Sequence, residues 1–218
     1  MKPYPFITMI TAALLDPVLA TSQTTNTVDA MSAEHPTADE WSFSTSLFGY
    51  VVPESRDYIN PNFTADHRWL HLEARYNYEA LETGSLWIGY KYSTGENVVF
   101  EVTPMLGGVF GELTGVAPGG NLALSYHRFE VSSQIEYVFD TGTSSGNFFY
   151  TWTELTYSPW DWFRAGVVIQ RTKAYKSELD IQRGFLAGVS YKRADFAVYV
   201  FNLGWTDPTI VLSAGFNF

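Results

Sequence analysis

Cysteine is missing from the 218-residue chain, which excludes disulfides and thiolate metal sites. Histidine is scarce, at four residues, and acidic residues outnumber basic ones by 23 to 13, giving a net charge of −10 at pH 7. The chain therefore offers no basic stripe for nucleic acid, and no glycine-rich phosphate loop leads from a strand into a helix. We expect no nucleic-acid partner and no cofactor.

Long apolar runs are also lacking, because no segment reaches the roughly 20 apolar residues that a membrane-spanning helix needs. The apolar segment Phe6 to Leu15 follows Lys2 and precedes the small-residue motif Val18-Leu19-Ala20. This order is typical of a secretory signal peptide, residues 1–20, cleaved after Ala20. Residues 21–40 are rich in Thr, Ser and Ala without periodicity, which predicts a disordered periplasmic lead-in. The folded domain would then span residues 41–218.

From Trp41 onward, apolar and polar residues alternate in segments separated by clusters of Gly, Pro, Asp, Asn and Ser. A period of two predicts β-strands, and no helical stretch interrupts the pattern. The candidate strands are Trp41–Val52, Arg68–Ala80, Ser85–Tyr92, Asn97–Leu113, Gly120–Tyr126, Val131–Phe139, Phe148–Tyr157, Trp162–Thr172, Ile181–Tyr191, Phe196–Leu203 and Thr209–Phe218.

This set holds an odd number of strands, whereas closed antiparallel barrels of single bacterial chains have an even number. Asn97–Leu113 is long enough for two strands that turn near Thr103-Pro104, although its apolar alternation continues through that point. If it is one strand, Trp41–Val52 would lie outside the ring. Pro53–His67 is then the longest connection, and Thr114–Gly119 is one of the longer loops. The count is about 12 strands, with ten as the alternative.

The clearest alternation lies in Arg68–Ala80. Its apolar face carries Leu70, Leu72, Ala74, Tyr76 and Tyr78, and its polar face carries His71, Glu73, Arg75, Asn77 and Glu79. Alternation alone does not say which face points inward, since a soluble lipocalin-like barrel would bury the apolar set. Tyrosines at the ends of the apolar faces, and more strands than the eight of a lipocalin, favour a membrane barrel with aromatic girdles. The predicted fold is all-β, a transmembrane antiparallel up-and-down barrel.

The segment Thr209–Phe218 alternates without a break and ends on an aromatic residue, whereas the end of a soluble domain tends to be polar and frayed. It resembles the C-terminal strand of bacterial outer-membrane β-barrel proteins. The resemblance implies an outer-membrane location and a terminal signal that the barrel assembly machinery recognises. The residues assigned to this assembly signal are Ile210, Leu212, Phe216 and Phe218.

The polar faces of the predicted strands would line the lumen. The residues assigned to this lining are His71, Glu73, Arg75, Glu79, Lys91, Glu101, Gln134, Glu136, Glu154, Arg164, Gln170 and Gln182. They could form a narrow aqueous pathway, or they could pair across a barrel too narrow to leave a pore. We expect Lys91 to lie within reach of Glu73, and Arg164 to lie within reach of Glu154.

Catalytic and metal-binding patterns are weak. His67 and His71 are about 13 Å apart along an extended strand, too far to share an ion, so we predict no metal site. His127 and Ser125 share the lumen-facing register, which any two alternate strand residues do. With no nucleophile, base and acid in a recognisable pattern, the chain is not expected to be an enzyme.

The sequence thus predicts a small outer-membrane β-barrel that is a narrow channel or a structural envelope protein with a polar, charge-paired lumen. The alternatives are an outer-membrane barrel enzyme acting on lipid and a soluble exported ligand-binding β-barrel. The expected partners are outer-membrane lipid, the assembly machinery and small solutes.

Overall fold

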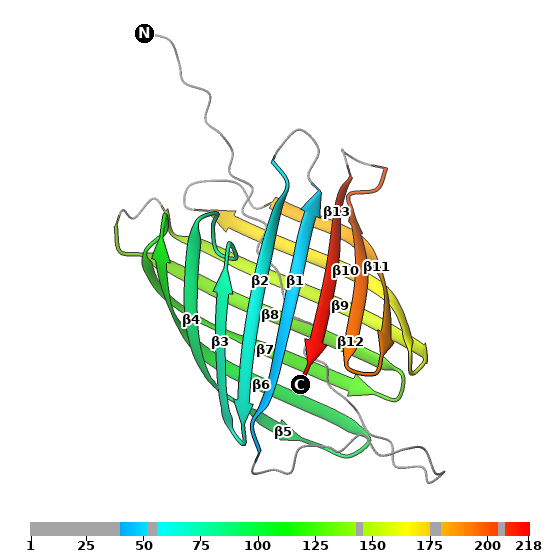
Figure 1. The fold of residues 1–218 in the computed structure, drawn as a ribbon. Coiled ribbons are helices and arrows are strands. Elements are labelled where there is room, and N and C mark those ends of the chain that lie inside the picture. Colours follow the sequence, from blue (N-terminus) through cyan, green and yellow to red (C-terminus); the bar gives the residue numbers. More distant parts are fainter. Residues whose placement is uncertain (1–39, 52–55, 143–145, 175–179, 205–207) are drawn as a thin grey trace.

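A computed structural model describes residues 40–51, 56–142, 146–174, 180–204 and 208–218. These residues form one antiparallel sheet that closes on itself as a barrel (Figure 1). The predicted signal peptide and nearly all of the predicted lead-in lie outside the described residues. In the part of the chain that the structure describes, no helix has the length and apolar character needed to span a bilayer.

The strands are tall enough to cross a bilayer, because most have eight to 14 residues and a transmembrane β-strand needs about 9–11. In chain order they are β1 (Ser42–Val51), β2 (Tyr58–His67), β3 (Leu70–Tyr76), β4 (Thr83–Tyr90), β5 (Tyr92–Thr94), β6 (Val98–Gly111), β7 (Gly115–Tyr126), β8 (Phe129–Asp140), β9 (Phe148–Trp160), β10 (Phe163–Ala174), β11 (Asp180–Tyr191), β12 (Ala194–Phe201) and β13 (Thr209–Asn217).

Closure joins the two ends of the strand sequence, because β1 pairs with β13 on one side and with β2 on the other. The remaining strands pair in sequence order, and β4 pairs with β6 to complete the ring. The short β5 continues the line of β4 along the same edge of β6, so the two count as one in a closed 12-strand barrel. The all-β barrel is confirmed. The ten-strand alternative is wrong, because β1 is one of the strands that form the barrel wall.

The turn predicted near Thr103-Pro104 is also wrong, since β6 is a single strand. On one side, β6 is paired with β7 straight through Pro104, which lies opposite Gly120. On the other side, the pairing with β4 stops at Met105 and the pairing with β5 resumes at Val102. Proline has no N–H to donate, so it is tolerated where a ladder is interrupted. Pro104 therefore marks the break between β4 and β5.

The strand that the sequence analysis missed is β2, in the segment Pro53–His67 predicted as the longest connection. Asn60, Pro61 and Asn62 are residue types that favour turns. In the structure both asparagines are buried on the inner face, and Pro61 has a register partner on β1 but none on β3. Polar residues are normal on the inner face of a membrane barrel. The twelfth strand therefore comes from β2 and not from a division of β6.

The two ends of the barrel differ in their connections. At the end that carries Phe218, called the C-terminal end below, tight turns join β2 to β3, β7 to β8 and β11 to β12 (Figure 1). Arg68, His127 and Lys192 in these turns have φ values of 54°, 53° and 56°, the left-handed region that tight turns use. The opposite end is called the loop end. Thr114–Gly119, predicted as a longer connection there, belongs to β7 from Gly115 onward.

The outer surface of the barrel is mostly apolar, with exposed side chains such as Leu86, Ile88 and Leu106. The residues predicted as an assembly signal, Ile210, Leu212, Phe216 and Phe218, are exposed on this outer surface. Large aromatic side chains gather at the C-terminal end as a girdle. Its exposed members are Trp41, Trp69, Tyr90, Tyr126, Phe129, Tyr157, Trp160, Trp162, Tyr191, Phe216 and Phe218. Such a surface matches lipid flanked by an aromatic interface and would be an unusually large apolar patch in water.

Candidate functional site: the barrel lumen

The inner face of the barrel carries the residues that the sequence assigns to the lumen. Nine of the assigned side chains are buried inside: His71, Glu73, Arg75, Glu79, Gln134, Glu136, Glu154, Gln170 and Gln182. Lys91, Glu101 and Arg164 also face inward and are half-buried. Tyr78 departs from its predicted face. It was placed on the apolar outer face, but it is fully buried in the lumen, because Asn77 has a φ of 57° and the strand alternation ends there.

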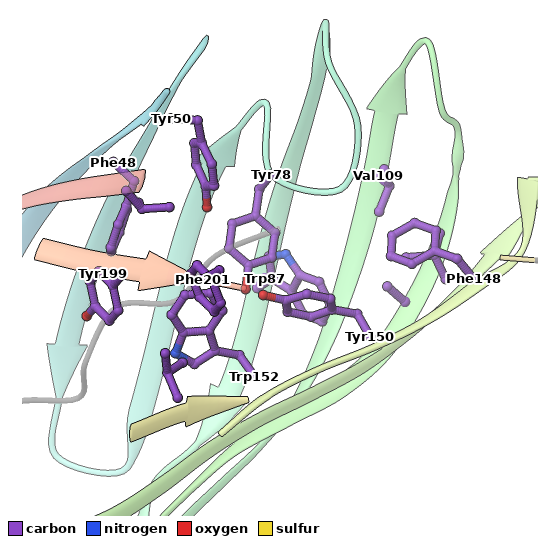
Figure 2. Packing of buried hydrophobic residues seen from close by; sticks show 14 of the residues in the cluster. Phe48, Tyr50, Tyr78, Trp87, Val109, Phe148, Tyr150, Trp152, Tyr199 and Phe201 are labelled. Carbon is purple, nitrogen blue, oxygen red and sulfur yellow. The ribbon is translucent and has the colours of Figure 1, made fainter. Parts of the chain in front are cut away.

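The lumen is divided into two halves of different composition. The loop half is filled by large side chains: Phe48, Tyr50, Tyr78, Trp87, Tyr150, Trp152, Tyr199 and Phe201 (Figure 2). The C-terminal half is lined by small residues: Ser44, Ser46, Thr64, Ala123, Ser125, Ser132, Gly188, Ala197, Ser213 and Gly215. We call the first the plug and the second the vestibule. The narrowest part of the lumen is therefore in the loop half.

Arg75 is the ionic centre of the plug. Its Nε and Nη2 donate to the two carboxylate oxygens of Glu73 at 2.6 and 2.8 Å, and its Nη1 donates to Glu136 at 3.0 Å. Glu79 lies 4.0 Å from the same Nη1. Turned so that both its amide atoms are satisfied, Gln134 accepts from Nη1 and Nη2. A bidentate Arg–carboxylate pair of this kind has a fixed geometry, so the cluster is a rigid bar across the lumen.

Two aromatic rings enclose the Arg75 guanidinium. Its Cζ lies 4.2 Å from the ring centre of Tyr78 and 4.5 Å from that of Trp87, both within cation–π range. The Trp87 indole N–H donates to Glu79 at 3.2 Å and to Ser85 at 3.0 Å. Together with the Arg75–Glu136 pair, these contacts connect β3, β4 and β8 through the lumen, so the ionic and aromatic parts of the plug are one packed unit.

Trp152 forms the second aromatic part of the plug. Its ring packs edge-on against Tyr199 at 5.4 Å and Phe201 at 5.2 Å between ring centres. Its indole N–H donates to Glu154 at 2.7 Å. Tyr150, on the same strand, packs edge-on against Tyr78 at 6.3 Å between ring centres, as the labelled side chains in Figure 2 illustrate. The inner faces of β9 and β12 and the connection after β3 are therefore joined by aromatic contacts.

The vestibule holds a second, separate ion pair. Arg164 donates from both terminal nitrogens to Asp195, at 2.5 and 2.7 Å, and Ser190 donates to the same carboxylate at 2.7 Å. The expected pairing of Arg164 with Glu154 is therefore wrong. The reason is register: Arg164 lies opposite Gly188 on β11, and the absence of a side chain there lets the guanidinium reach β12.

A third group lies near the C-terminal opening. Lys91 donates to Asp66 at 2.8 Å, and the His71 imidazole lies between Asp66 at 2.6 Å and Glu73 at 3.5 Å. The expected contact of Lys91 with Glu73 is therefore replaced by one with Asp66, which the sequence analysis had placed in a loop. This chain of contacts links the vestibule opening to the ionic centre of the plug.

Several buried polar atoms inside the plug have no partner among the described protein groups. They are the hydroxyls of Tyr50 and Tyr150, both amide atoms of Asn60 and Asn62, and one carboxylate oxygen each of Glu79 and Glu136. Leaving such an atom unsatisfied costs about 1–3 kcal/mol, so buried polar groups are normally hydrogen-bonded to protein or water. Water molecules inside the plug would be the partners that satisfy these atoms.

The pattern considered for catalysis does not assemble. His127 was expected to face the lumen beside Ser125, but it lies exposed in the β7–β8 turn with its ring against Tyr126. Ser125 donates to Glu130 at 3.1 Å. Among the described residues, no group of three or more His, Asp or Glu side chains is arranged to hold a metal ion.

Sequence reasoning missed some lumen residues. Asp195 falls in the connection between the predicted strands Ile181–Tyr191 and Phe196–Leu203, but β12 begins at Ala194 and Asp195 is buried. Counting back in steps of two from Tyr199 would have placed Asp195 on the inner face. Trp87 and Trp152 also point into the lumen, although a large aromatic residue in a membrane strand is normally predicted to face lipid. No signal in a single sequence separates these two placements.

Comparison with known proteins supports the barrel class through structure alone. No protein-family model matches the chain, and no curated protein matches it in sequence. Among solved structures it is similar to a KdgM porin, at 12% identity and a TM-score of 0.56, covering 80% of this chain and 99% of that one. A KdgM porin in complex with disordered oligogalacturonate gives 11% identity and a TM-score of 0.53, covering 80% and 98%. The chain therefore has the fold of a bacterial outer-membrane β-barrel.

Proposed function

We propose that the protein is a narrow, low-conductance channel of the bacterial outer membrane for small polar solutes. The observation that carries this proposal is the contrast inside the lumen: a small-residue vestibule leads to a plug whose buried polar atoms lack protein partners. Water can satisfy those atoms, whereas Trp152 and Tyr199, which are 0% exposed, leave no room for a wide pore. Small polar molecules would pass and large ones would be excluded.

Lumen charge supports neutral or cationic solutes. The described acidic side chains facing inward include Asp66, Glu73, Glu79, Glu101, Glu130, Glu136, Glu154 and Asp195, and the described basic ones are Arg75, Lys91 and Arg164. A lumen whose acids outnumber its bases attracts cations and repels anions. Anionic oligosaccharides such as oligogalacturonate would therefore be disfavoured as solutes for this chain.

The outer surface supports an outer-membrane location, reached through the predicted cleavable signal peptide. Short turns are periplasmic in this class, so the C-terminal end with its vestibule would face the periplasm and the plug would lie toward the cell exterior. The protein would be surrounded by outer-membrane lipid. A catalytic role is not part of the proposal, because the His127 and Ser125 pattern is not assembled.

Conductance in a planar bilayer tests the proposal. We expect refolded native protein to give small, steady steps, with a reversal potential in a salt gradient that indicates preference for cations. Large porin-like steps would contradict the plug. If neither the native protein nor a variant with a truncated plug conducts, the protein is a structural envelope component, the second candidate, which the close packing of Arg75 and its partners favours. Native protein recovered from a detergent-free soluble fraction would end the membrane proposal.

The closing strand is proposed as the recognition signal for the barrel assembly machinery. Ile210, Leu212, Phe216 and Phe218 all face outward and are exposed, so they are accessible to such a machine before lipid covers them. Deleting Phe218 should lower the amount of folded, heat-modifiable barrel in the outer membrane severalfold. The control is a variant that lacks residues 21–39, between the predicted cleavage site and Glu40, and keeps the predicted signal peptide. Equal levels of folded protein with and without Phe218 would contradict the assembly-signal proposal.

A further inference from the structure

Two arginines interrupt the apolar outer surface near the loop end. Arg171 on β10 and Arg183 on β11 face outward and are exposed, and neither guanidinium forms an ion pair or hydrogen bond with another described residue. Among the described outward-facing strand side chains, they are the ones with a permanent charge. No described outward-facing side chain of β8 to β12 is a carboxylate. Within the part of the chain that the structure describes, the pair is therefore a cationic patch without a counter-ion.

The register brings the two guanidiniums together. Arg171 lies opposite Ile181, and Arg183 lies opposite Ile169, so the arginines are diagonal neighbours on adjacent strands. Such diagonal positions are about 7–8 Å apart, a distance that long side chains bridge easily. Thr151 on β9 lies directly opposite Arg171 and adds a hydroxyl at the edge of the patch. Both guanidiniums can therefore contact one ligand.

The height of the patch matches the outer membrane interface. Along their strands, Arg171 lies about eight residues from Phe163 and Arg183 about eight from Tyr191, and these two residues are at the C-terminal end of the barrel. At about 3.3 Å per residue and a strand tilt of about 40°, this is a height of about 20 Å. The apolar band of such barrels is about 25 Å tall, and an arginine can extend its head group several ångströms further toward water. The guanidiniums therefore reach the level of the outer-leaflet head groups.

We propose that Arg171 and Arg183 form a binding site for the phosphate of a phosphorylated glycolipid, lipid A, in the outer leaflet. Guanidinium groups bind phosphate oxygens through paired N–H donors, which makes arginine well suited to this ligand. The surface just below the patch is apolar and exposed, with Val167 and Phe185 on the same two strands. It would hold an acyl chain while the arginines hold the phosphate. A free anion would leave that apolar surface unused.

This inference rests on the proposed outer-membrane location and orientation, and does not depend on conduction. A native barrel that does not conduct would leave it intact. Native protein recovered from a detergent-free soluble fraction would contradict both the outer-membrane proposal and this inference.

Native mass spectrometry of the refolded barrel with lipid A tests the site. We expect the native protein to retain lipid A through detergent exchange, and Arg171→Gln together with Arg183→Gln to reduce retention at least tenfold. Arg171→Lys together with Arg183→Lys should retain part of the lipid A, since the positive charge remains but the paired N–H donors are lost. Lys192→Gln, which removes an exposed charge at the opposite end, is the matched control and should change nothing. Heat-modifiability on gels establishes that each variant is folded, and the single Gln variants replace the double one if it is not.

Two further arms identify the ligand. Lipid A from which the phosphates have been removed should bind the native protein no better than phosphorylated lipid A binds the double Gln variant. Inorganic phosphate at millimolar concentration should not displace the lipid. Unchanged retention by the Gln variants, or equal retention of dephosphorylated lipid A, would overturn the proposal. Complete displacement by inorganic phosphate would show a simple anion site and would overturn the assignment to a lipid.

Discussion

The plug and the vestibule are two halves of the same lumen that differ in how their side chains pack. In the plug, Arg75, Trp87 and Trp152 bring opposite walls into contact and bury their polar groups against one another. In the vestibule, the Arg164–Asp195 pair joins β10 to β12, and much of the surrounding wall is lined by Ser, Thr, Ala and Gly. From this difference we expect the loop half to set stability and the size of the solute, and the C-terminal half to set the charge of the solute that enters.

Removing the two arginines should separate the halves by stability. Arg75→Met leaves Glu73 and Glu136 buried without their cation, and breaking a buried pair in this way costs about 3–5 kcal/mol of unfolding free energy. Arg164→Met should cost about 1–3 kcal/mol, because the vestibule can admit water to Asp195. Guanidinium unfolding of the barrel in lipid vesicles, followed by tryptophan fluorescence, gives both values.

The control for this prediction is Arg75→Met combined with Glu73→Gln and Glu136→Gln, which should recover part of the loss because fewer charges remain unpaired. Equal losses for Arg75→Met and Arg164→Met would contradict the distinction between plug and vestibule.

A space-creating change in the plug should open the channel. Trp87→Ala removes the ring that packs on Arg75 and closes the lumen beside β6, so we expect single-channel conductance to rise severalfold. Ser132→Ala, in the vestibule, is the matched control and should leave conductance within experimental error. If both variants conduct like the native protein, the barrier to ions is not in the plug.

Glycines of the two halves should respond differently to a methyl group. A Cβ on Gly107 would lie 2.5 Å from the Trp87 ring, whereas a Cβ on Gly215 would meet its nearest atoms at 3.9 Å, an ordinary contact. Gly107→Ala should therefore cost about 1–3 kcal/mol through overpacking. Gly215→Ala should be near neutral. The same unfolding measurement applies, and a tolerant Gly107 would indicate that the plug packs loosely.

Charge in the vestibule should affect selectivity more than conductance. Glu130 faces the lumen, accepts a hydrogen bond from Ser125 and forms no ion pair with a described cation, so Glu130→Gln removes a charge near the entrance without freeing an arginine. We expect a shift of a few millivolts in reversal potential toward weaker cation preference. Glu112→Gln, exposed at the loop end, should shift it less. An equal shift for both would place the selectivity outside the vestibule.

The sequence predicts the barrel well because alternation and the final Phe218 are local signals. It places the inner face of most strands correctly for the same reason, since strand geometry leaves only two choices for each residue. It fails at β2, where Asn60 and Asn62 resemble loop residues until the lumen is known to be polar. Pairings such as Arg164 with Asp195 depend on register and on an absent side chain at Gly188, and neither is visible in one sequence.

The position of Trp87 over Gly107 also carries information for assembly. The two residues are register partners on β4 and β6, and Trp87 has space there because Gly107 has no side chain. A slip of two residues between these strands keeps every side chain on its face but places Met105 or Val109 under the indole instead. Misaligned pairings that satisfy the alternation would then clash with the ring. The indole therefore selects one register of β4 against β6 when the barrel forms.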